Sequence, residues 1–388
     1  MQGAMRVIGL AFLLCVVWKA EGQTQVKRPR MLLSASDVQH MRESMGKYAL
    51  FDQAFDKAKK MLDQAIGRPI DVPVPKDAGG YTHEKHKQNY KEMQAAGVLF
   101  QITGDERYAV FVRDMLLTYA ALYPTLGRHP KAASADSGRL FWQTLNETVW
   151  MVHVAQAYDC IYDWLKPANR AVIEGKLLRP MASFFTVEHA ATIDRIHNHG
   201  TWMVAAVGMI GYALNDKNLV DVALYGTKKD KKSGFVRQMD FLFSPDGYYT
   251  EGAYYARYAI MPFVLFAQAI ENNQPELQIF EYRNQILKKA LSSALQLTDV
   301  SGRYIPINDA LKEMSILSPE SVLATDVTFQ RYGGDKGLLG IAQKQGSVSL
   351  DGAGLSVARA LQEGKGSFEF PYERVEFTDG GGGGGGGM

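Results

Sequence analysis

The sequence has 388 residues, of which 46% are hydrophobic and 22% are charged, and its formal net charge is +2. This length and apolar content are sufficient for a large buried core and allow two or three domains. The near-neutral charge, with no long basic run in the sequence, argues against a nucleic-acid-binding protein. A polyanionic ligand stays compatible with this composition, because a cleft can be locally basic on a nearly neutral protein.

The first 22 residues have the pattern of a signal peptide. Arg6 precedes an apolar run, residues 7–18, that is too short to span a bilayer, and Ala20-Glu21-Gly22 offers small residues for cleavage. We therefore expect a secreted or periplasmic protein that has no membrane partner. The mature chain then keeps one cysteine, Cys160, and its apolar helical context predicts a buried structural thiol.

From residue 34 to about 300 the apolar residues recur with the helical period. Ser34 and Asp37 have the spacing of a capping box, which predicts a helix that starts there and runs toward Ile66. Short separators rich in Gly, Pro, Asn and Asp divide the helices that follow. These helices are predicted at about 84–103, 106–123, 139–164, 167–189, 198–214, 233–243, 251–271 and 276–298.

Short links between many helices predict antiparallel neighbours. Broad apolar faces, such as that of residues 149–155, require packing partners on more than one side. An α/α toroid, in which helical hairpins are arranged in a ring, meets both requirements. A regular helical solenoid is less favoured because the sequence shows no clean repeat. We predict an all-α fold of the toroid type for residues 23–345.

The character of the sequence changes after residue 345. Residues 347–350 and 367–370 alternate between polar and apolar side chains as strands do, and 375–377 has the same pattern. We expect residues 346–379 to be the start of a β-domain of which only the first strands are present. The glycine tail that follows, at 380–388, cannot hold one conformation.

The densest polar cluster lies at residues 195–201, directly before an apolar helical run. The backbone N–H groups and the dipole at a helix N-terminus favour an anion such as a uronate carboxylate. Asn198 can donate through its amide, and His199 can donate or act as a base. The alternative is that Asn198 only caps the helix and that the histidines form local hydrogen bonds.

A second cluster has five tyrosines and one arginine within residues 248–258. On a helix, Tyr254 lies one turn from Arg257 and Tyr258, and Tyr255 also lies one turn from Tyr258. Such an array can stack on sugar rings, pair with a carboxylate and supply phenol protons. The alternative is aromatic packing in the core.

Two further segments carry candidate binding residues. His83 and His86 have a spacing compatible with a metal ion, but no cysteine or other motif completes a site, so we expect a loop that contacts sugar and no metal. Gln143 and Asn146 are spaced to place two amides on one helical face. These amides bind sugar hydroxyls or only hydrogen-bond between helices.

Together these segments resemble the oligoalginate lyases, polysaccharide lyase family 17 of the heparinase II/III-like superfamily. The most specific part of the resemblance is the pairing of Asn198-His199-Gly200-Thr201 with the tyrosine-rich segment. The matching segments, which span nearly the whole mature chain, are 80–87, 138–146, 198–201, 245–258 and 306–310. The resemblance implies an α/α toroid followed by an antiparallel β-sandwich, with the active cleft between them.

The resemblance also implies β-elimination at a uronic acid of alginate or oligoalginate, with no cofactor identifiable in the residues present. By family analogy, Asn198 and His199 neutralise the carboxylate at C5, with Arg257 helping to position it. Tyr255 then gives a proton to the leaving O4, or acts as base for the opposite C5 configuration. The residues expected to bind the sugars are Gln143, Asn146, Arg257, Tyr258, Tyr254 and His83.

In the family, the β-domain contributes a further catalytic tyrosine, basic cleft residues and a metal site. Here the chain stops after residue 379, where that domain begins, so we expect a truncated protein with impaired activity. The alternatives are a lyase of another uronate polymer such as heparan, and a domain that only binds acidic oligosaccharide. A glycoside hydrolase is a further alternative, with Asp246, Glu251 and Asp309 as the available acids.

Overall fold

The computed structural model describes residues 27–377 except 133–135, 308–309 and 365–366, and the described chain is almost entirely helical. Strand pairing in this part is limited to isolated bridges. The α-helices are α1 (Ala35–Ser44), α2 (Ala49–Ile66), α3 (Tyr81–Thr103), α4 (Glu106–Leu122), α5 (Thr144–Ile161), α6 (Pro167–Ile173), α7 (Arg179–Ser183), α8 (Ala190–Ile193), α9 (Asn198–Leu214), α10 (Lys217–Tyr225), α11 (Phe235–Phe241), α12 (Ala253–Asn273), α13 (Tyr282–Gln296), α14 (Pro319–Arg331), α15 (Lys336–Gln345) and α16 (Gly352–Glu363). Two π-helical turns, η2 (Glu174–Leu178) and η3 (Phe184–Glu188), flank α7.

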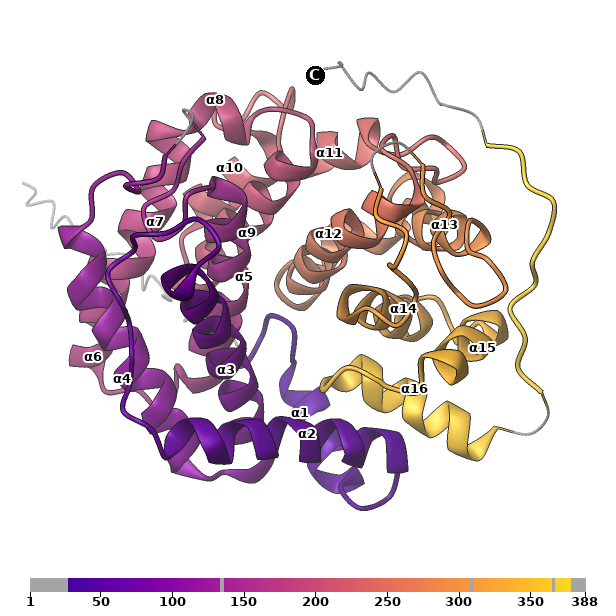
Figure 1. Ribbon diagram of the computed structural model, residues 1–388, viewed down its shortest axis with the longest axis horizontal. Helices are drawn as coiled ribbons and strands as arrows, with labels where there is room; N and C mark the ends of the chain where they lie inside the picture. Colours follow the sequence, from indigo (N-terminus) through magenta and orange to yellow (C-terminus); the bar gives the residue numbers. More distant parts are fainter. Residues whose placement is uncertain (1–26, 133–135, 308–309, 365–366, 378–388) are drawn as a thin grey trace, which may run out of the picture.

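The helices form two layers around a ring (Figure 1). In the inner layer, α3, α5, α9, α12, α14 and α16 each pack against the next, and α1 lies between α16 and α3 and closes the ring. Helices α2, α4, α10, α13 and α15 pack against the inner helices that adjoin them in the sequence. The predicted α/α toroid is therefore confirmed.

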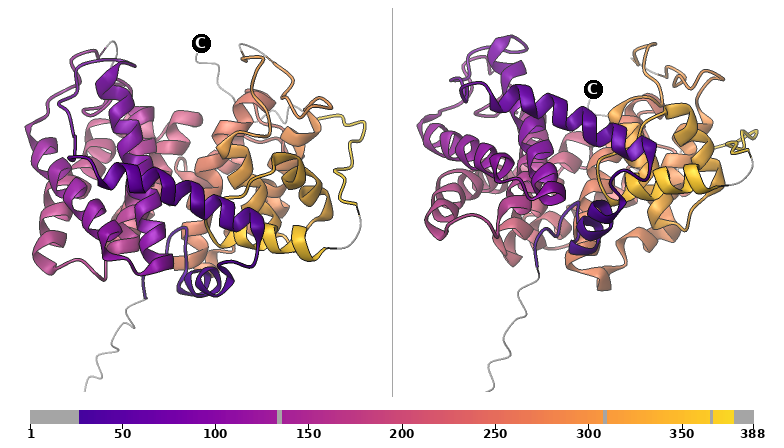
Figure 2. Two further views of the ribbon diagram at one scale, coloured as in Figure 1. Left: turned by 60° about the horizontal axis from the view of Figure 1, so that its bottom comes forward. Right: turned by 90° about the horizontal axis from the view of Figure 1, so that it is seen from below.

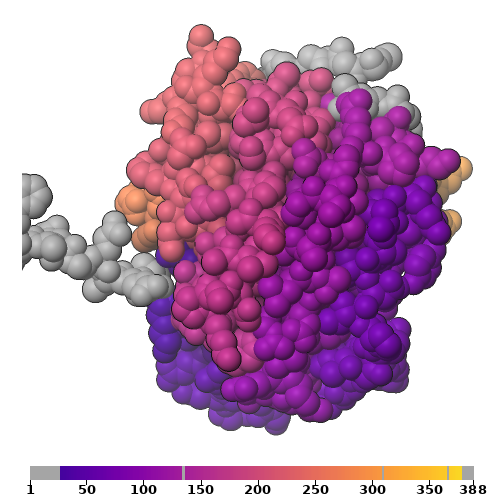
Figure 3. Space-filling view, turned by 90° about the vertical axis from the view of Figure 1, so that its left-hand side faces the viewer, coloured from indigo at the N-terminus to yellow at the C-terminus, as the bar shows by residue number. Residues whose placement is uncertain are grey.

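The burial of side chains explains which helices lie inside. Nearly every residue of α5 and α9 is buried, so these helices need partners on all sides. Helix α2 fully buries only Phe51, Leu62 and Ala65 and leaves its other face toward solvent. Cys160 on α5 is buried and free, as predicted. Figure 3 shows the outer surface of the N-terminal half, where successive segments adjoin one another from indigo to salmon.

Helix α16 was not predicted. It lies inside the segment that the sequence assigned to a β-domain, yet it packs against α1, α2, α14 and α15 and completes the ring. Two hydrogen bonds join its end to the α1–α2 connection: Tyr48 Oη donates to Glu363 Oε1 (2.7 Å), and Gln362 Nε2 donates to the Lys47 carbonyl (2.7 Å). Residues 347–350 and 367–370 are not in strands. Where a second domain begins stays a prediction.

Two other predicted helices have different bounds. The capping box of Ser34 and Asp37 is formed, but the helix ends at Ser44 because Gly46 takes a left-handed conformation with φ 78° before α2 begins. Helix α5 starts at Thr144, five residues later than predicted, because the backbone N–H groups just before it donate to the Glu147 carboxylate instead of joining a helix. Helices α10, α14 and α15 were not predicted.

Some predictions lie outside the described residues. They are the signal peptide at 1–22, the glycine tail at 380–388, and Asn308 and Asp309 of the segment 306–310. Within the described chain, no helix is both long enough and apolar enough to span a bilayer.

Candidate active site

The N-termini of five inner helices meet at one end of the ring. Asp136 connects the starts of α5 and α9. Its carbonyl accepts a hydrogen bond from Thr144 N (3.0 Å), and its negative charge raises the pKa of His199. Three side-chain contacts join the other helix starts: Asn146 to His83 (3.5 Å), Asn198 to Glu251 (3.1 Å), and Arg257 to Glu320 (3.1 Å). Figure 2 shows the connections 67–80 and 297–307 on opposite sides of the same end of the ring. Several helix dipoles pointing at one place favour an anionic ligand there.

Asn198 is the first residue of α9 but does not cap it. The cap is His197, whose Nδ1 accepts from Gly200 N (3.2 Å), while Asn198 Nδ2 donates to Glu251 Oε2 (3.1 Å). The interpretation of Asn198 as a simple cap was therefore wrong. Its amide is oriented by a carboxylate from the start of the next inner helix, which is the arrangement expected of a positioned polar group.

Close packing explains the glycine in the Asn-His-Gly-Thr motif. A Cβ at Gly200 would lie 2.2 Å from the Arg195 carbonyl oxygen and 2.8 Å from Gln238 Nε2. The same Gln238 amide donates to the Arg195 carbonyl (2.6 Å) and its Oε1 accepts from Thr201 Oγ1 (3.2 Å). The segment before α9 is thus held against α11, which fixes the direction in which the Asn198 and His199 side chains point.

His199 is half-buried beside the capping histidine, with the two ring centroids 5.4 Å apart. Burial lowers the pKa of His199, while the negative charge of Asp136 raises it and the positive charge of Arg195 lowers it further. Burial lowers the pKa of His197 to about 4. Both imidazoles are therefore neutral at neutral pH, so that each ring offers one donor and one acceptor nitrogen.

The tyrosine-rich segment enters α12 through Gly252, which has φ 90° and so favours glycine. Tyr254 is buried and Tyr255 is half-buried, and their rings meet edge to face with centroids 4.8 Å apart. The Arg257 guanidinium carbon lies 5.2 Å from the Tyr254 ring centroid. The predicted Tyr254–Arg257 pair therefore exists, and both side chains are largely covered.

Arg257 already has an acidic partner. Its Nη1 donates to Glu320 Oε2 of α14 at 3.1 Å, and only 5% of the arginine side chain is exposed. A buried guanidinium is stable only when it is paired, so Glu320 holds Arg257 in place. A substrate carboxylate bound by Arg257 would therefore share its guanidinium with Glu320.

An aromatic contact joins α9 and α12, and Tyr90 of α3 lies within electrostatic range of it. The Tyr258 ring packs on Trp202 of α9 with centroids 5.3 Å apart. Burial raises the pKa of Tyr258, with further contributions from Tyr90 and Glu320, and burial and Glu320 raise the pKa of Tyr90 to about 12. These phenols keep their protons at physiological pH, so they act as donors and not as bases.

The predicted binding residues of α3 and α5 lie close together. His83 is buried, its ring meets Phe141 edge to face at 5.2 Å, and burial lowers its pKa. Asn146 reaches His83 Nε2, and Gln143 is the half-buried N-cap residue of α5. His86 is fully buried against the Tyr119 hydroxyl (2.8 Å), and its ring also packs on Phe141 with centroids 5.7 Å apart. Among the described residues, no group of three or more His, Cys, Asp or Glu side chains is arranged to hold a metal ion.

Two residues of the site were missed by the sequence analysis. Glu320 lies 63 residues after Arg257, and Tyr90 lies on α3, so no local spacing links either of them to the tyrosine segment. The only sequence signal was the expectation that a buried arginine needs an acidic partner, which does not identify the partner. Glu251 had been considered only as an acid for hydrolysis.

The fold and the site define a class: a helical toroid with tyrosine, amide and neutral imidazole groups gathered where helix dipoles favour an anion. A family model described as "Alginate lyase" matches residues 43–302. The chain belongs to this family.

Three known proteins are similar to this chain. An exo-oligoalginate lyase from Saccharophagus degradans is 48% identical over 353 residues, which are 91% of this chain and 48% of that protein. An alginate lyase from Stenotrophomonas maltophilia is 45% identical over 370 residues, which are 95% of this chain and 49% of that protein. The chain therefore spans about half the length of the curated relatives it matches. The crystal structure of an alginate lyase from Bacteroides ovatus has the same fold, with a TM-score of 0.60 at 10% identity over 82% of this chain and 95% of the other.

Proposed function

We propose that this chain carries the catalytic toroid of a lyase that cleaves alginate or oligoalginate by β-elimination. The observation that supports this most directly is that Asn198 and His199 begin α9, Tyr255 lies in the first turn of the adjacent α12, and Asn198 is hydrogen-bonded to Glu251 just before α12, in a member of the alginate lyase family. We also propose that the mature chain is exported, on the pattern of residues 1–22.

In the proposed reaction, Asn198 and His199 donate hydrogen bonds to the uronate carboxylate and lower the cost of the enediolate charge. For the C5 configuration that faces it, Tyr255 takes the C5 proton as a phenolate, and the electron pair of the C5–H bond forms the C4–C5 double bond. The C4–O4 bond breaks as O4 takes a proton from Tyr255, giving a 4,5-unsaturated uronate. Glu251 keeps the Asn198 amide in its orientation. Tyr254, Tyr258, Gln143, Asn146 and His83 are the proposed sugar-binding groups.

The proposal is tested by ultraviolet absorbance of the protein mixed with alginate oligosaccharides, with heparan and hyaluronan oligosaccharides in parallel. The expected result is a rise from the conjugated unsaturated uronate with alginate. A rise only with another polymer would reassign the substrate. New reducing ends without an absorbance rise would indicate hydrolysis, and binding without either product would indicate a binding domain.

The pH dependence of this activity follows from His199. Because burial lowers its pKa below the usual 6.5, the neutral imidazole persists as the pH falls, and the change in kcat/KM that accompanies its protonation, the acidic limb of the profile, is expected below pH 6.5. Asp136→Asn removes a charge that raises this pKa, so the limb should move to lower pH. Arg195→Gln removes a charge that lowers it, so the limb should move to higher pH. A wild-type midpoint near 4 would assign the limb to His197, whose pKa is about 4.

A further inference from the structure

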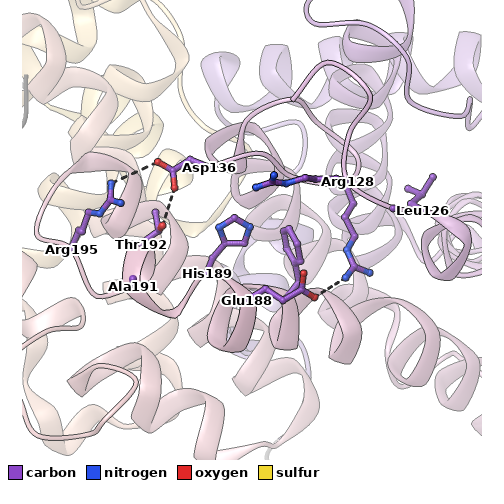
Figure 4. Close-up of a pocket in the computed structure, with 11 residues that line it drawn as sticks. Leu126, Arg128, Asp136, Glu188, His189, Ala191, Thr192 and Arg195 are labelled. Carbon is purple, nitrogen blue, oxygen red and sulfur yellow. Dashed lines mark hydrogen bonds and ion pairs between the residues drawn. The ribbon is translucent and has the colours of Figure 1, made fainter. Parts of the chain in front are cut away.

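A cavity of about 500 Å³ lies beside the N-terminus of α9 (Figure 4). Its walls come from the segment that follows α4 and from the η3–α8 segment, and none of the proposed catalytic or sugar-binding residues lines it. A π-helical turn, η3, forms part of one wall, and such turns occur frequently at functional sites. The cavity is large enough for a sugar unit, and it adjoins the proposed catalytic site through Asp136 and Arg195, whose charges act on the pKa of His199.

The chemistry of the walls matches an acidic sugar. Three arginines, Arg128, Arg139 and Arg195, line the cavity against two carboxylates, Asp136 and Glu188. In Figure 4 the Arg128 guanidinium extends across the cavity toward Asp136. Each arginine has five N–H donors, more than one carboxylate can accept, so donors remain for a ligand carboxylate.

The pairing of the arginines leaves one of them loosely held. Arg139 Nη2 lies 2.8 Å from Glu188 Oε1, and its guanidinium also stacks on Phe184, 4.8 Å from the ring centroid. Arg195 Nη1 lies 3.7 Å from Asp136 Oδ2, which is longer than a hydrogen bond, and 55% of its side chain is exposed. Arg195 can therefore turn to a ligand at little cost.

A basic loop lies next to this cavity. Asp194, adjacent to Arg195, accepts from Thr227 N (2.9 Å) and from Ser233 Oγ (2.7 Å), at the two ends of the loop 228–232. That loop carries four exposed lysines around one aspartate. Clustered positive charge of this kind attracts a polyanion over a distance of about 10 Å at moderate ionic strength. The basic surface thus extends beyond the cavity, which suits a chain of acidic sugars better than a small anion.

We propose that this cavity is a second binding site for a uronate unit of an acidic polysaccharide, at which Arg128 and Arg195 hold the sugar carboxylate. The site retains the polymer while another part of the same chain occupies the Tyr255 site. The inference rests on the proposed acidic-saccharide substrate, but not on the elimination step.

The test is calorimetric binding of oligouronates to the full chain with Tyr255→Phe, which prevents turnover of the ligand. We expect Arg128→Gln combined with Arg195→Gln to weaken binding of long oligouronates by about 10-fold, the effect of losing a charge-assisted hydrogen bond. When Arg128→Gln is combined with Arg195→Lys instead, the charge at position 195 is kept, and part of the lost affinity should be restored. The matched control is Arg179→Gln, since Arg179 is similarly exposed and is paired with Asp216 at 2.8 Å outside the cavity.

Three results would overturn the inference. They are equal affinities of the cavity variant and the Arg179→Gln control, equal binding of a neutral oligosaccharide of the same length, and displacement of the oligouronate by equimolar inorganic phosphate. Failure of the proposed function would look different, because wild-type protein would then form no unsaturated product from alginate even though the cavity variant still lost oligouronate affinity.

Discussion

Replacing Tyr255 by phenylalanine is expected to lower kcat by about 10³-fold, within the range that a positioned general acid contributes. The variant removes one hydroxyl from a half-buried ring in the first turn of α12 and leaves the edge-to-face contact with Tyr254 intact. O4 would then leave without a proton, while the groups that bind the sugar stay in place. The absorbance assay measures the loss of turnover, and calorimetry with oligoalginate should show an unchanged dissociation constant.

The matched control for this variant is Tyr249→Phe in the same segment. Tyr249 is 1% exposed, and its buried hydroxyl has no hydrogen-bond partner among the described residues. Deleting that hydroxyl costs no hydrogen bond, so both stability and turnover should stay near those of the wild type. Retained turnover in Tyr255→Phe, or equal losses in the two variants, would contradict the role of Tyr255 as proton donor.

Local features of this chain could be predicted from the sequence because their causes are local. The Ser34–Asp37 capping box depends on a spacing of three residues, and α9 begins at Asn198 as predicted because an apolar run follows a polar cluster. The Tyr254–Arg257 contact depends on one helical turn. The toroid itself follows from helices that are apolar on several sides, such as α5.

Features that depend on burial or on tertiary contacts could not be predicted. The start of α5 is displaced because the buried Glu147 accepts from the Arg139, Leu140 and Phe141 backbone N–H groups. The burial that removes this carboxylate from water also raises its pKa to about 7. The residues of α16 were assigned to the start of a β-domain because two of the helix's partners, α1 and α2, lie at the other end of the chain. Glu320 was missed for the same reason.

The second large effect is expected at the Arg257–Glu320 pair. Arg257→Met should lower the free energy of unfolding by about 3 kcal/mol, because breaking a buried ion pair leaves one charge without its partner. The same variant should raise KM for oligoalginate by at least about 10-fold if Arg257 also positions the substrate carboxylate, since a charge-assisted hydrogen bond is lost. Denaturant unfolding and steady-state kinetics measure the two effects separately.

Glu320→Gln and the double variant separate the two roles of Arg257. Glutamine keeps an acceptor near the Arg257 guanidinium, so Glu320→Gln alone should cost less stability than Arg257→Met and should leave KM close to that of the wild type. In the double variant no buried charge is left unpaired, so stability should recover relative to Arg257→Met while KM stays high. If KM recovers together with stability, Arg257 acts only by holding Tyr254 and α14 in place, and a substrate contact is ruled out. If KM stays high in a protein as stable as the wild type, the guanidinium binds the substrate and Glu320 is the group that holds it ready.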